Sequence, residues 1–299
     1  MKRIFLFLVT NLAVLVTLGI VANVLCALLG TTVEGLIGPE YASLAIFAFV
    51  YGVIGAFISL LLSKPMAKFA CRAEVIDGSE GEAERWLVST VEDLARRANV
   101  KMPEVAIYPG AANAFATGAF RNHALVAVSS DIMRQMTKEE LRAVLGHEMS
   151  HVANGDMVTL TLIQGVLNAF VIFFSRVIAS VLANAGRGEG SRSRSGGGLY
   201  FVLVMVLDIC LGILASLVVF AFSRRREYAA DAGSARLLGS PSSMIAALRR
   251  LGNLQPGVLP NSLKAFGIAE GRRTSLWSTH PSLDDRIAAL QNLSTNAFA

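Results

Sequence analysis

The pentapeptide His147-Glu148-Met149-Ser150-His151 combines the residue types that bind and activate a metal ion in hydrolytic enzymes. Residues four apart on a helix lie on the same side, roughly 6 Å apart along the axis. Two imidazoles in this arrangement can reach one tetrahedral Zn²⁺, and the glutamate after the first histidine can take a proton from a water molecule there. The spacing therefore predicts that His147 and His151 bind a metal and that Glu148 is a general base.

The residues around the pentapeptide predict the helix that this chemistry requires. Thr137 and Glu140 have the spacing of a capping box, in which each side chain binds the backbone amide of the other residue. Apolar residues then recur at helical spacing: Leu141, Val144, Leu145 and Val152. The dipeptide Asn154-Gly155 can end the helix. On this evidence alone, two histidines on an ordinary amphipathic helix are the alternative interpretation.

A hydrolytic zinc site needs a third protein ligand and keeps its fourth position for water. His123 and His280 are the remaining histidines, but Glu227 is the better candidate, since Asp231 follows it by four residues on the same helical face. One carboxylate can bind the metal while the other accepts the second N–H of a ligating imidazole. Ion pairing of both carboxylates with residues 224–226, which are all arginine, explains them equally well.

The composition indicates a membrane protein. Of 299 residues, 54% are hydrophobic and only 16% are charged, whereas soluble domains contain about 25% charged residues. The apolar residues gather in four segments, each long enough to span a bilayer: about 4–29, 41–62, 158–185 and 199–222. Arg176 and Asp208 lie within the last two, and three interpretations are open: they pair with each other, they face a water-filled cleft, or the third segment kinks or tilts. The Gly-, Ser- and Arg-rich residues 186–198 are predicted to form a flexible loop.

The charge distribution predicts the orientation of these segments. The net charge is +5, and the basic residues flank the apolar segments at Lys2, Arg3, Lys64, Lys68, Arg72 and Arg224 to Arg226. The positive-inside rule then places both termini, residues 63–156 and residues 223–299 in the cytoplasm. No nucleic-acid-binding motif accompanies the basic residues, so we expect the lipid bilayer and not nucleic acid as the partner of the basic flanks.

The segments outside the membrane predict a small sheet beside the metal-binding helix. A helix is expected over 80–100, strands over 104–108, 114–117 and 124–128, and a further helix that begins at Ser240-Pro241 and runs to Leu251. An exposed edge strand of such a sheet can hold an extended peptide through backbone hydrogen bonds. The expected parts are thus 1–62 and 157–222 in the membrane, and 63–156 and 223–299 forming a split catalytic domain.

The order and spacing of these motifs resemble the HtpX-type membrane zinc metalloproteases of bacteria, relatives of the CAAX-prenyl endoproteases within the gluzincin peptidases. The matching segments are Asn113 to Gly118, His147 to His151 with Asn154 to Asp156, Arg226 to Asp231, and His280 to Ser282. The resemblance implies an α-helical integral membrane protein of the cell inner membrane. It would have four transmembrane helices and a cytoplasmic α+β catalytic domain of the zincin (gluzincin) type.

The resemblance also implies roles for individual residues. One Zn²⁺ per chain would be bound by His147, His151 and Glu227, with Glu148 as the general base. Asp231 would be the carboxylate behind a ligating histidine, and Asn113 would lie on the substrate-binding edge strand. His280 and Arg286 would lie near the scissile carbonyl as catalytic residues. From the residues alone, His280 is equally well a loop histidine before Pro281, and Asn113 a turn residue.

We therefore expect a membrane-embedded zinc endopeptidase that cuts membrane or misfolded proteins at the cytoplasmic face, in quality control and stress response. A prenyl-protein-type processing protease is an alternative, although four spans are too few to enclose a large chamber. A non-catalytic metal-binding membrane regulator is another, although a structural metal site has no use for Glu148. The sequence carries no indication of the oligomeric state.

Overall fold

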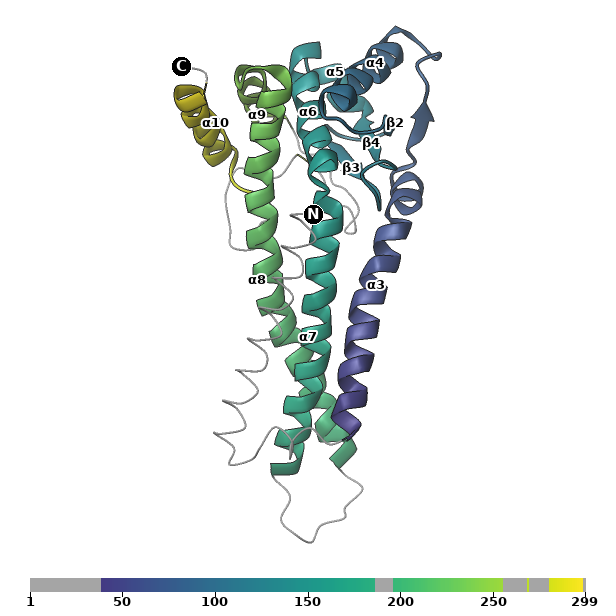
Figure 1. Ribbon diagram of the computed structural model, residues 1–299, viewed down its shortest axis with the longest axis vertical. Coiled ribbons are helices and arrows are strands. Elements are labelled where there is room, and N and C mark those ends of the chain that lie inside the picture. The colour runs from purple at the N-terminus through teal and green to yellow at the C-terminus, as the bar shows by residue number, and fades with distance from the viewer. Residues whose placement is uncertain (1–38, 186–195, 255–267, 269–279, 298–299) are drawn as a thin grey trace. The chain divides into compact units, whose positions relative to one another are not determined.

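The computed structural model of the chain describes residues 39–185, 196–254, 268 and 280–297. In chain order the elements are α3 (Pro39–Cys71), β1 (Glu74–Ile76), α4 (Glu82–Arg97), β2 (Glu104–Tyr108), β3 (Ala114–Thr117), β4 (Leu125–Ser129), α5 (Ser130–Gln135), α6 (Lys138–Asn154), α7 (Asp156–Ala185), α8 (Gly196–Leu238), α9 (Ser242–Asn253) and α10 (Leu283–Ala297) (Figure 1). The chain divides into two compact units, residues 1–55 with 164–215 and residues 56–163 with 216–299.

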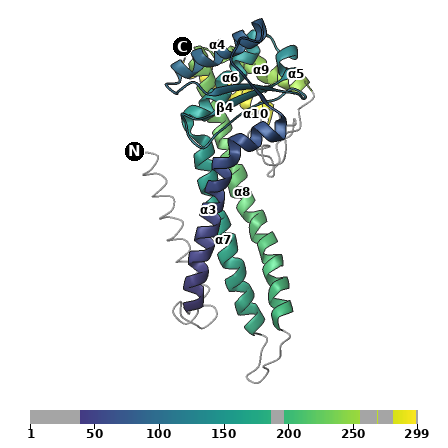
Figure 2. The ribbon, with the colours of Figure 1, turned by 90° about the vertical axis from the view of Figure 1, so that its right-hand side faces the viewer.

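Three described helices are long and apolar enough to cross a membrane (Figure 2): Ser43–Cys71 within α3, Asp156–Ala183 within α7, and Gly198–Leu238 within α8. They contain the second, third and fourth of the expected apolar segments. The first expected span, about 4–29, lies outside the described residues, as does most of the loop expected over 186–198.

Helix α8 is longer than the sequence patterns predicted. We expected a span ending near 222 and a separate helix beginning near Glu227, but a single helix of 43 residues runs from Gly196 to Leu238. Residues 222–232 contain neither proline nor glycine, so nothing in the backbone interrupts the helix where the apolar segment gives way to the arginines.

The second unit contains a four-stranded sheet in the order β1-β2-β4-β3. Strands β2 and β4 are parallel, with Glu104 opposite Leu125, while β1 and β3 pair antiparallel at the two edges. Strands β2 and β3 have the predicted bounds, and β4 begins one residue later than expected. The three-residue strand β1 was not predicted, because so short a segment shows no alternation.

The two faces of the sheet enter separate buried clusters, because successive strand residues point to opposite sides. Val126 and Val128 lie in a large core together with apolar residues of α4, α6 and α9. On the other face Phe115 packs in a smaller cluster that includes Ala67 near the end of α3. The sheet is therefore covered by α6 on the face that belongs to the larger core.

Helix α6 begins and ends as its sequence predicts. The Thr137 Oγ1 atom accepts a hydrogen bond from the Glu140 amide at 3.2 Å, and the Glu140 carboxylate accepts one from the Thr137 amide at 2.9 Å, which confirms the capping box. Gly155 ends the helix with the left-handed angles φ 64° and ψ 35°. Helix α7 starts at the next residue, Asp156, so one glycine separates the two helices.

Two other helices differ slightly from expectation. Helix α4 is shorter at both ends than the segment expected over 80–100. Helix α9 starts at Ser242, and the residue that caps it is Pro241 instead of Ser240. The Ser240 hydroxyl still accepts the Ser242 amide at 3.2 Å, so the serine binds the start of the helix from one position further out.

Candidate metal centre

Helix α6 presents three buried polar side chains from its last turns. His147, Glu148 and His151 are each at most 7% exposed. The two imidazole rings are perpendicular, with centroids 4.7 Å apart, and their Nε2 atoms are 3.1 Å apart. The i, i+4 spacing therefore brings two nitrogen atoms to one point, as the sequence predicted.

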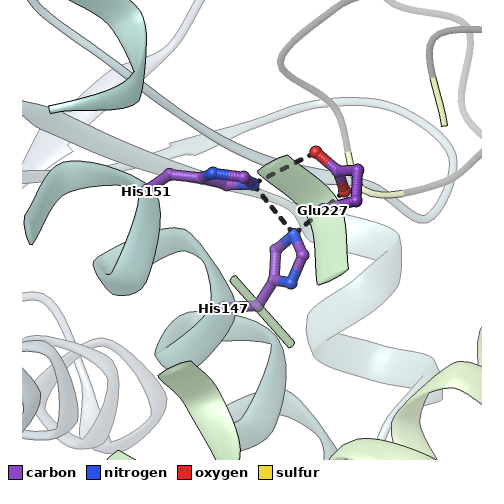
Figure 3. Close-up of side chains that lie close together, drawn as sticks. All are labelled: His147, His151 and Glu227. Carbon is purple, nitrogen blue, oxygen red and sulfur yellow. Dashed lines mark hydrogen bonds and ion pairs between the residues drawn. The ribbon is translucent and has the colours of Figure 1, made fainter. Parts of the chain in front are cut away.

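Helix α8 brings Glu227 to the same point (Figure 3). Its Oε2 atom lies 3.3 Å from His147 Nε2, and its Oε1 atom lies 3.3 Å from His151 Nε2. Glu227 is fully buried, and neither of its oxygens accepts a well-formed hydrogen bond from the described residues, although the Nδ1 atom of His280 lies 3.0 Å from Oε2. Ligand atoms of these three residues all lie within 4.8 Å of one another, an arrangement that can hold a metal ion.

Small residues allow α8 to approach α6 closely enough for this contact. A Cβ atom at Gly146 would lie 2.8 Å from the Ser234 Oγ, and one at Gly233 would lie 2.7 Å from the Ser150 Cβ. Ser234 also donates a hydrogen bond to the Ala143 carbonyl at 2.8 Å. The glycine of each helix thus accommodates the serine of the other, next to the ligating residues.

Each histidine has a carboxylate behind it. His147 Nδ1 lies 2.8 Å from Asp231 Oδ1, and His151 Nδ1 lies 2.7 Å from Asp156 Oδ2. A carboxylate only accepts, so both histidines carry their proton on Nδ1 and turn the Nε2 lone pairs toward each other. Lone pairs 3.1 Å apart repel unless a positive charge lies between them.

The buried carboxylates around the histidines also favour a positive charge at this point. Burial disfavours protonation of His147, but the carboxylates of Asp231 and Glu227 outweigh it and raise the pKa to about 9. Besides the histidines, the buried charged side chains among the described residues are four carboxyls and two guanidiniums: Glu148, Asp156, Glu227, Asp231, Arg226 and Arg286. With every carboxyl ionised and the histidines neutral, as metal ligands must be, this set has two negative charges in excess. A divalent cation between the histidines balances them.

Helix α10 and the residues before it complete the cluster. His280 is buried, with its Nδ1 atom 3.0 Å from Glu227 Oε2. Arg286 is 1% exposed and donates two hydrogen bonds to Asp231. Burial opposes the charge of Arg286, but Asp231, Glu227 and Glu148 outweigh it and raise its pKa. The guanidinium lies against Asp231, and the place of both residues near a substrate carbonyl stays a prediction.

Glu148 has the environment expected of a general base. Its side chain is fully buried, and neither carboxyl oxygen has a hydrogen-bond partner among the described residues. Burial raises its pKa above the ordinary value, although the nearby histidines lower it in part. A carboxyl group with a raised pKa can accept a proton in one step and release it in the next.

Asn113, which was predicted to lie on the edge strand, directly precedes β3, and its side chain is already engaged. Its Oδ1 atom accepts hydrogen bonds from the amides of Ala114 at 2.9 Å and Ile268 at 3.1 Å. The Ile268 amide also lies 3.2 Å from the Ala114 carbonyl oxygen. We expected an exposed edge, whereas all four residues of β3 are buried and one carbonyl is paired by Ile268.

Sequence reasoning missed two parts of this arrangement. Asp156 was noted only as part of a motif. Because the chain turns at Gly155, the next residue, Asp156, comes back within hydrogen-bond distance of His151. The pairing of Gly146 with Ser234, and of Ser150 with Gly233, was not anticipated. Small residues four apart on α6 are a signal for close helix approach, but they do not identify the partner helix.

Comparisons with known proteins agree with this geometry. The model of "Peptidase family M48" matches residues 82–294. A curated relative called "Protease HtpX homolog" from Verminephrobacter eiseniae is 55% identical over 294 residues, covering 98% of this chain and 99% of the relative. Homologues with that same name from Paracidovorax citrulli and Bordetella petrii are 54% and 52% identical, with the same coverage.

Among solved structures, the crystal structure of S. mikatae Ste24p is similar in fold, with a TM-score of 0.54 at 19% sequence identity. The superposition covers 82% of this chain but only 56% of that one. At this identity the likeness concerns the fold alone.

Proposed function

We propose that this chain hydrolyses peptide bonds with one Zn²⁺ held by His147, His151 and Glu227. The proposal starts from the family: the chain belongs to peptidase family M48. Family membership and the full-length likeness to HtpX proteases make the chain a membrane metalloprotease. The identity of the metal, the roles of single residues and the orientation in the membrane go further, and they rest on the arguments below.

The donor set and its spacing support zinc. Two imidazole nitrogens and one carboxylate are the ligands of many hydrolytic zinc sites, which leave one position open. Ligand atoms about 2.0–2.1 Å from the same ion in tetrahedral geometry are about 3.3 Å apart. The two histidine Nε2 atoms are 3.1 Å apart, and each lies 3.3 Å from a different oxygen of Glu227, so the carboxylate lies across both nitrogens. The excess of two negative charges matches a divalent ion.

The residues of the chain then carry the proton transfers. When bound, zinc polarises the scissile carbonyl and makes water more acidic. Glu148 removes a proton from the attacking water as its oxygen bonds to the carbonyl carbon. Glu148 then passes that proton to the amine nitrogen as the C–N bond breaks, so the peptide and one water become an acid and an amine.

His280 is placed to help at the carbonyl oxygen. Its imidazole is buried, and its Nε2 has no hydrogen-bond partner among the described residues. An N–H at this position can donate to the oxygen that gains negative charge during the attack. We therefore assign His280 to the oxyanion.

The substrate would extend along the edge of β3 that faces away from β4. Residues of an antiparallel strand alternate between facing and turning away from the partner strand. The Ala114 carbonyl binds Ile268 and so points away from β4, and the backbone groups of Ala116 point the same way. A peptide added to this edge would pair with Ala116, with Asn113 holding the start of the strand in place.

The orientation follows from charge. We propose that residues 63–156 and 223–299 lie in the cytoplasm, that residues 1–62 and 157–222 form the membrane part of four spans, and that both termini are inside. Lys64 and Lys68 both pair with Glu104 and hold β2 to the end of α3. Substrates would be membrane or misfolded proteins cut at the cytoplasmic face, in quality control, as the HtpX likeness suggests.

The observation that carries this proposal is that the Nε2 atoms of His147 and His151 meet the carboxylate of Glu227 at one buried point. The test compares wild type with Glu148→Gln, both purified in detergent, for cleavage of unfolded casein and for zinc content. We expect about one zinc per chain in both and a loss of cleavage of about 10²–10⁴-fold in the variant. Glu139→Gln, at an exposed position in the first turn of α6, is the matched control and should cleave normally.

Wild-type proteolysis by Glu148→Gln, free of other proteases, would overturn the assignment of the base. Bound zinc without cleavage by the wild type would favour a metal-binding regulator instead of an enzyme.

A further inference from the structure

Arg286 is the largest fully buried side chain among the described residues, and it lies beside the metal centre. Its Nε atom donates to Asp231 Oδ2 at 2.8 Å, and its Nη2 atom donates to Asp231 Oδ1 at 2.7 Å. The remaining nitrogen, Nη1, lies 3.8 Å from Glu227 Oε2. Every nitrogen of the guanidinium therefore faces a carboxylate of α8.

We propose that Arg286 is a positioning residue that sets the metal site through Asp231. This inference rests on the proposed function, because it concerns how a ligand of the zinc is held.

The two parallel hydrogen bonds fix both oxygens of Asp231. A bidentate arginine–carboxylate pair has a defined plane, whereas a lysine would supply only a point charge. The Oδ1 atom that Arg286 holds is the same atom that accepts the His147 Nδ1 proton at 2.8 Å. Arg286 thereby directs the acceptor at His147, which fixes the ring and turns Nε2 toward Glu227.

The contacts of His280 differ from those of Arg286. The side chain of Arg286 is 1% exposed, and its Nε and Nη2 atoms both donate to Asp231. The Nε2 atom of His280 has no hydrogen-bond partner among the described residues.

The second ligand has no such support. Asp156 binds His151 at 2.7 Å, and among the described contacts no arginine bonds to Asp156. Its side chain is 12% exposed, against 2% for Asp231. A change in α10 should therefore alter the position of His147 and leave that of His151 unchanged.

The test uses full-length protein in detergent and three arginine variants. Arg286→Met removes the charge and the fork, Arg286→Lys keeps the charge alone, and Arg250→Met is the matched control. Arg250 donates Nε and Nη2 to the Gln135 carbonyl at an exposed position outside the metal cluster. The readouts are zinc affinity by chelator competition, the visible spectrum of the Co²⁺-loaded protein, and kcat and KM for a peptide.

We expect Arg286→Met to bind zinc about 10–100-fold more weakly and to change the Co²⁺ spectrum. Its kcat should fall with KM altered less than about twofold, because the change acts on the metal ligand His147 through Asp231. Arg286→Lys should lie between this variant and wild type, and Arg250→Met should match wild type. Wild-type affinity and spectrum with a raised KM in Arg286→Met would overturn the inference.

A double variant covers the case in which Arg286→Met does not fold. Asp231→Asn with Arg286→Met removes both charges and leaves neither buried alone. If Arg286 acts through Asp231, this protein binds zinc no more weakly than Asp231→Asn alone, whereas additive losses would overturn the inference. A wild type that binds no metal would instead count against the proposed function.

Discussion

Each of the two compact units contains an arginine–aspartate pair between helices, and the two pairs are built differently. In the second unit Arg286 and Asp231 are 1% and 2% exposed and share two hydrogen bonds of 2.7 and 2.8 Å. In the first unit Arg176 and Asp208 are 28% and 38% exposed and share one contact of 3.3 Å. The residue types are the same, but the number and quality of the contacts are not.

The difference shows what each pair contributes. The Nη1 atom of Arg176 also donates to the Ile172 carbonyl and the Ser175 hydroxyl, both at 3.0 Å, so α7 supplies most of the acceptors itself. Asp208 then reduces the cost of a charge within a candidate span but orients nothing further. Asp231 passes its orientation to a histidine of the metal centre. An ion pair fixes the direction of a side chain when it is buried and has two parallel hydrogen bonds, as Arg286–Asp231 does. A partly exposed pair with one long contact, such as Arg176–Asp208, only offsets charge.

The largest effect is expected from Asp231→Asn. The amide oxygen can still accept from His147, but Arg286 then faces a neutral, donating group inside the core. We expect the free energy of unfolding to fall by about 3–5 kcal/mol and zinc to bind roughly 100-fold more weakly. Thermal unfolding and chelator competition measure both effects. Asp284→Asn, at an exposed position on α10, is the control and should leave both near wild type.

Asp156→Asn should have a smaller effect on the same centre. The new amide can accept from His151, and no buried arginine loses a partner, so the zinc affinity should fall about 10-fold, the lower end of the usual range. Chelator competition on this variant beside Asp231→Asn gives the comparison directly. If Asp156→Asn loses as much zinc affinity as Asp231→Asn, or more, then His147 is not the better supported of the two histidine ligands.

The smallest effect is expected from Asp208→Asn. Arg176 keeps two acceptors on α7, and a single hydrogen bond between membrane helices is worth about 0.6 kcal/mol. The zinc affinity and kcat should therefore equal those of wild type, and the unfolding temperature in detergent should change by a few degrees at most. A tenfold loss of zinc affinity would contradict the distinction between the two pairs.

Local signals in the sequence predicted the parts of the fold that depend on neighbours along the chain. Thr137, Glu140 and Gly155 fixed both ends of α6, and the bounds of β2 and β3 followed from apolar runs between turn residues. The resemblance to a known family brought Glu227 and Asp231 to the histidines, and their contacts have the predicted partners.

The remaining features depend on packing between distant segments. The orientation of Arg286 toward Asp231 requires α10 to lie against α8, 55 residues away in the chain, and the residues give no sign of which acceptor the guanidinium will choose. Ile268 takes a carbonyl of β3 from 155 residues beyond Asn113. Strand β1 exists because β2 offers an edge, since its three residues carry no pattern of their own.

The single glycine between α6 and α7 has a mechanical consequence. The hydrogen bond from His151 to Asp156 crosses this elbow, from the last turn of one helix to the first residue of the next. The angle between the two helices and the direction of the imidazole are therefore coupled through this hydrogen bond. A change in the backbone angles at Gly155 would therefore stretch this hydrogen bond or rotate the imidazole ring. The position of His151 Nε2 in the metal centre thus depends on the direction in which α7 leaves Gly155.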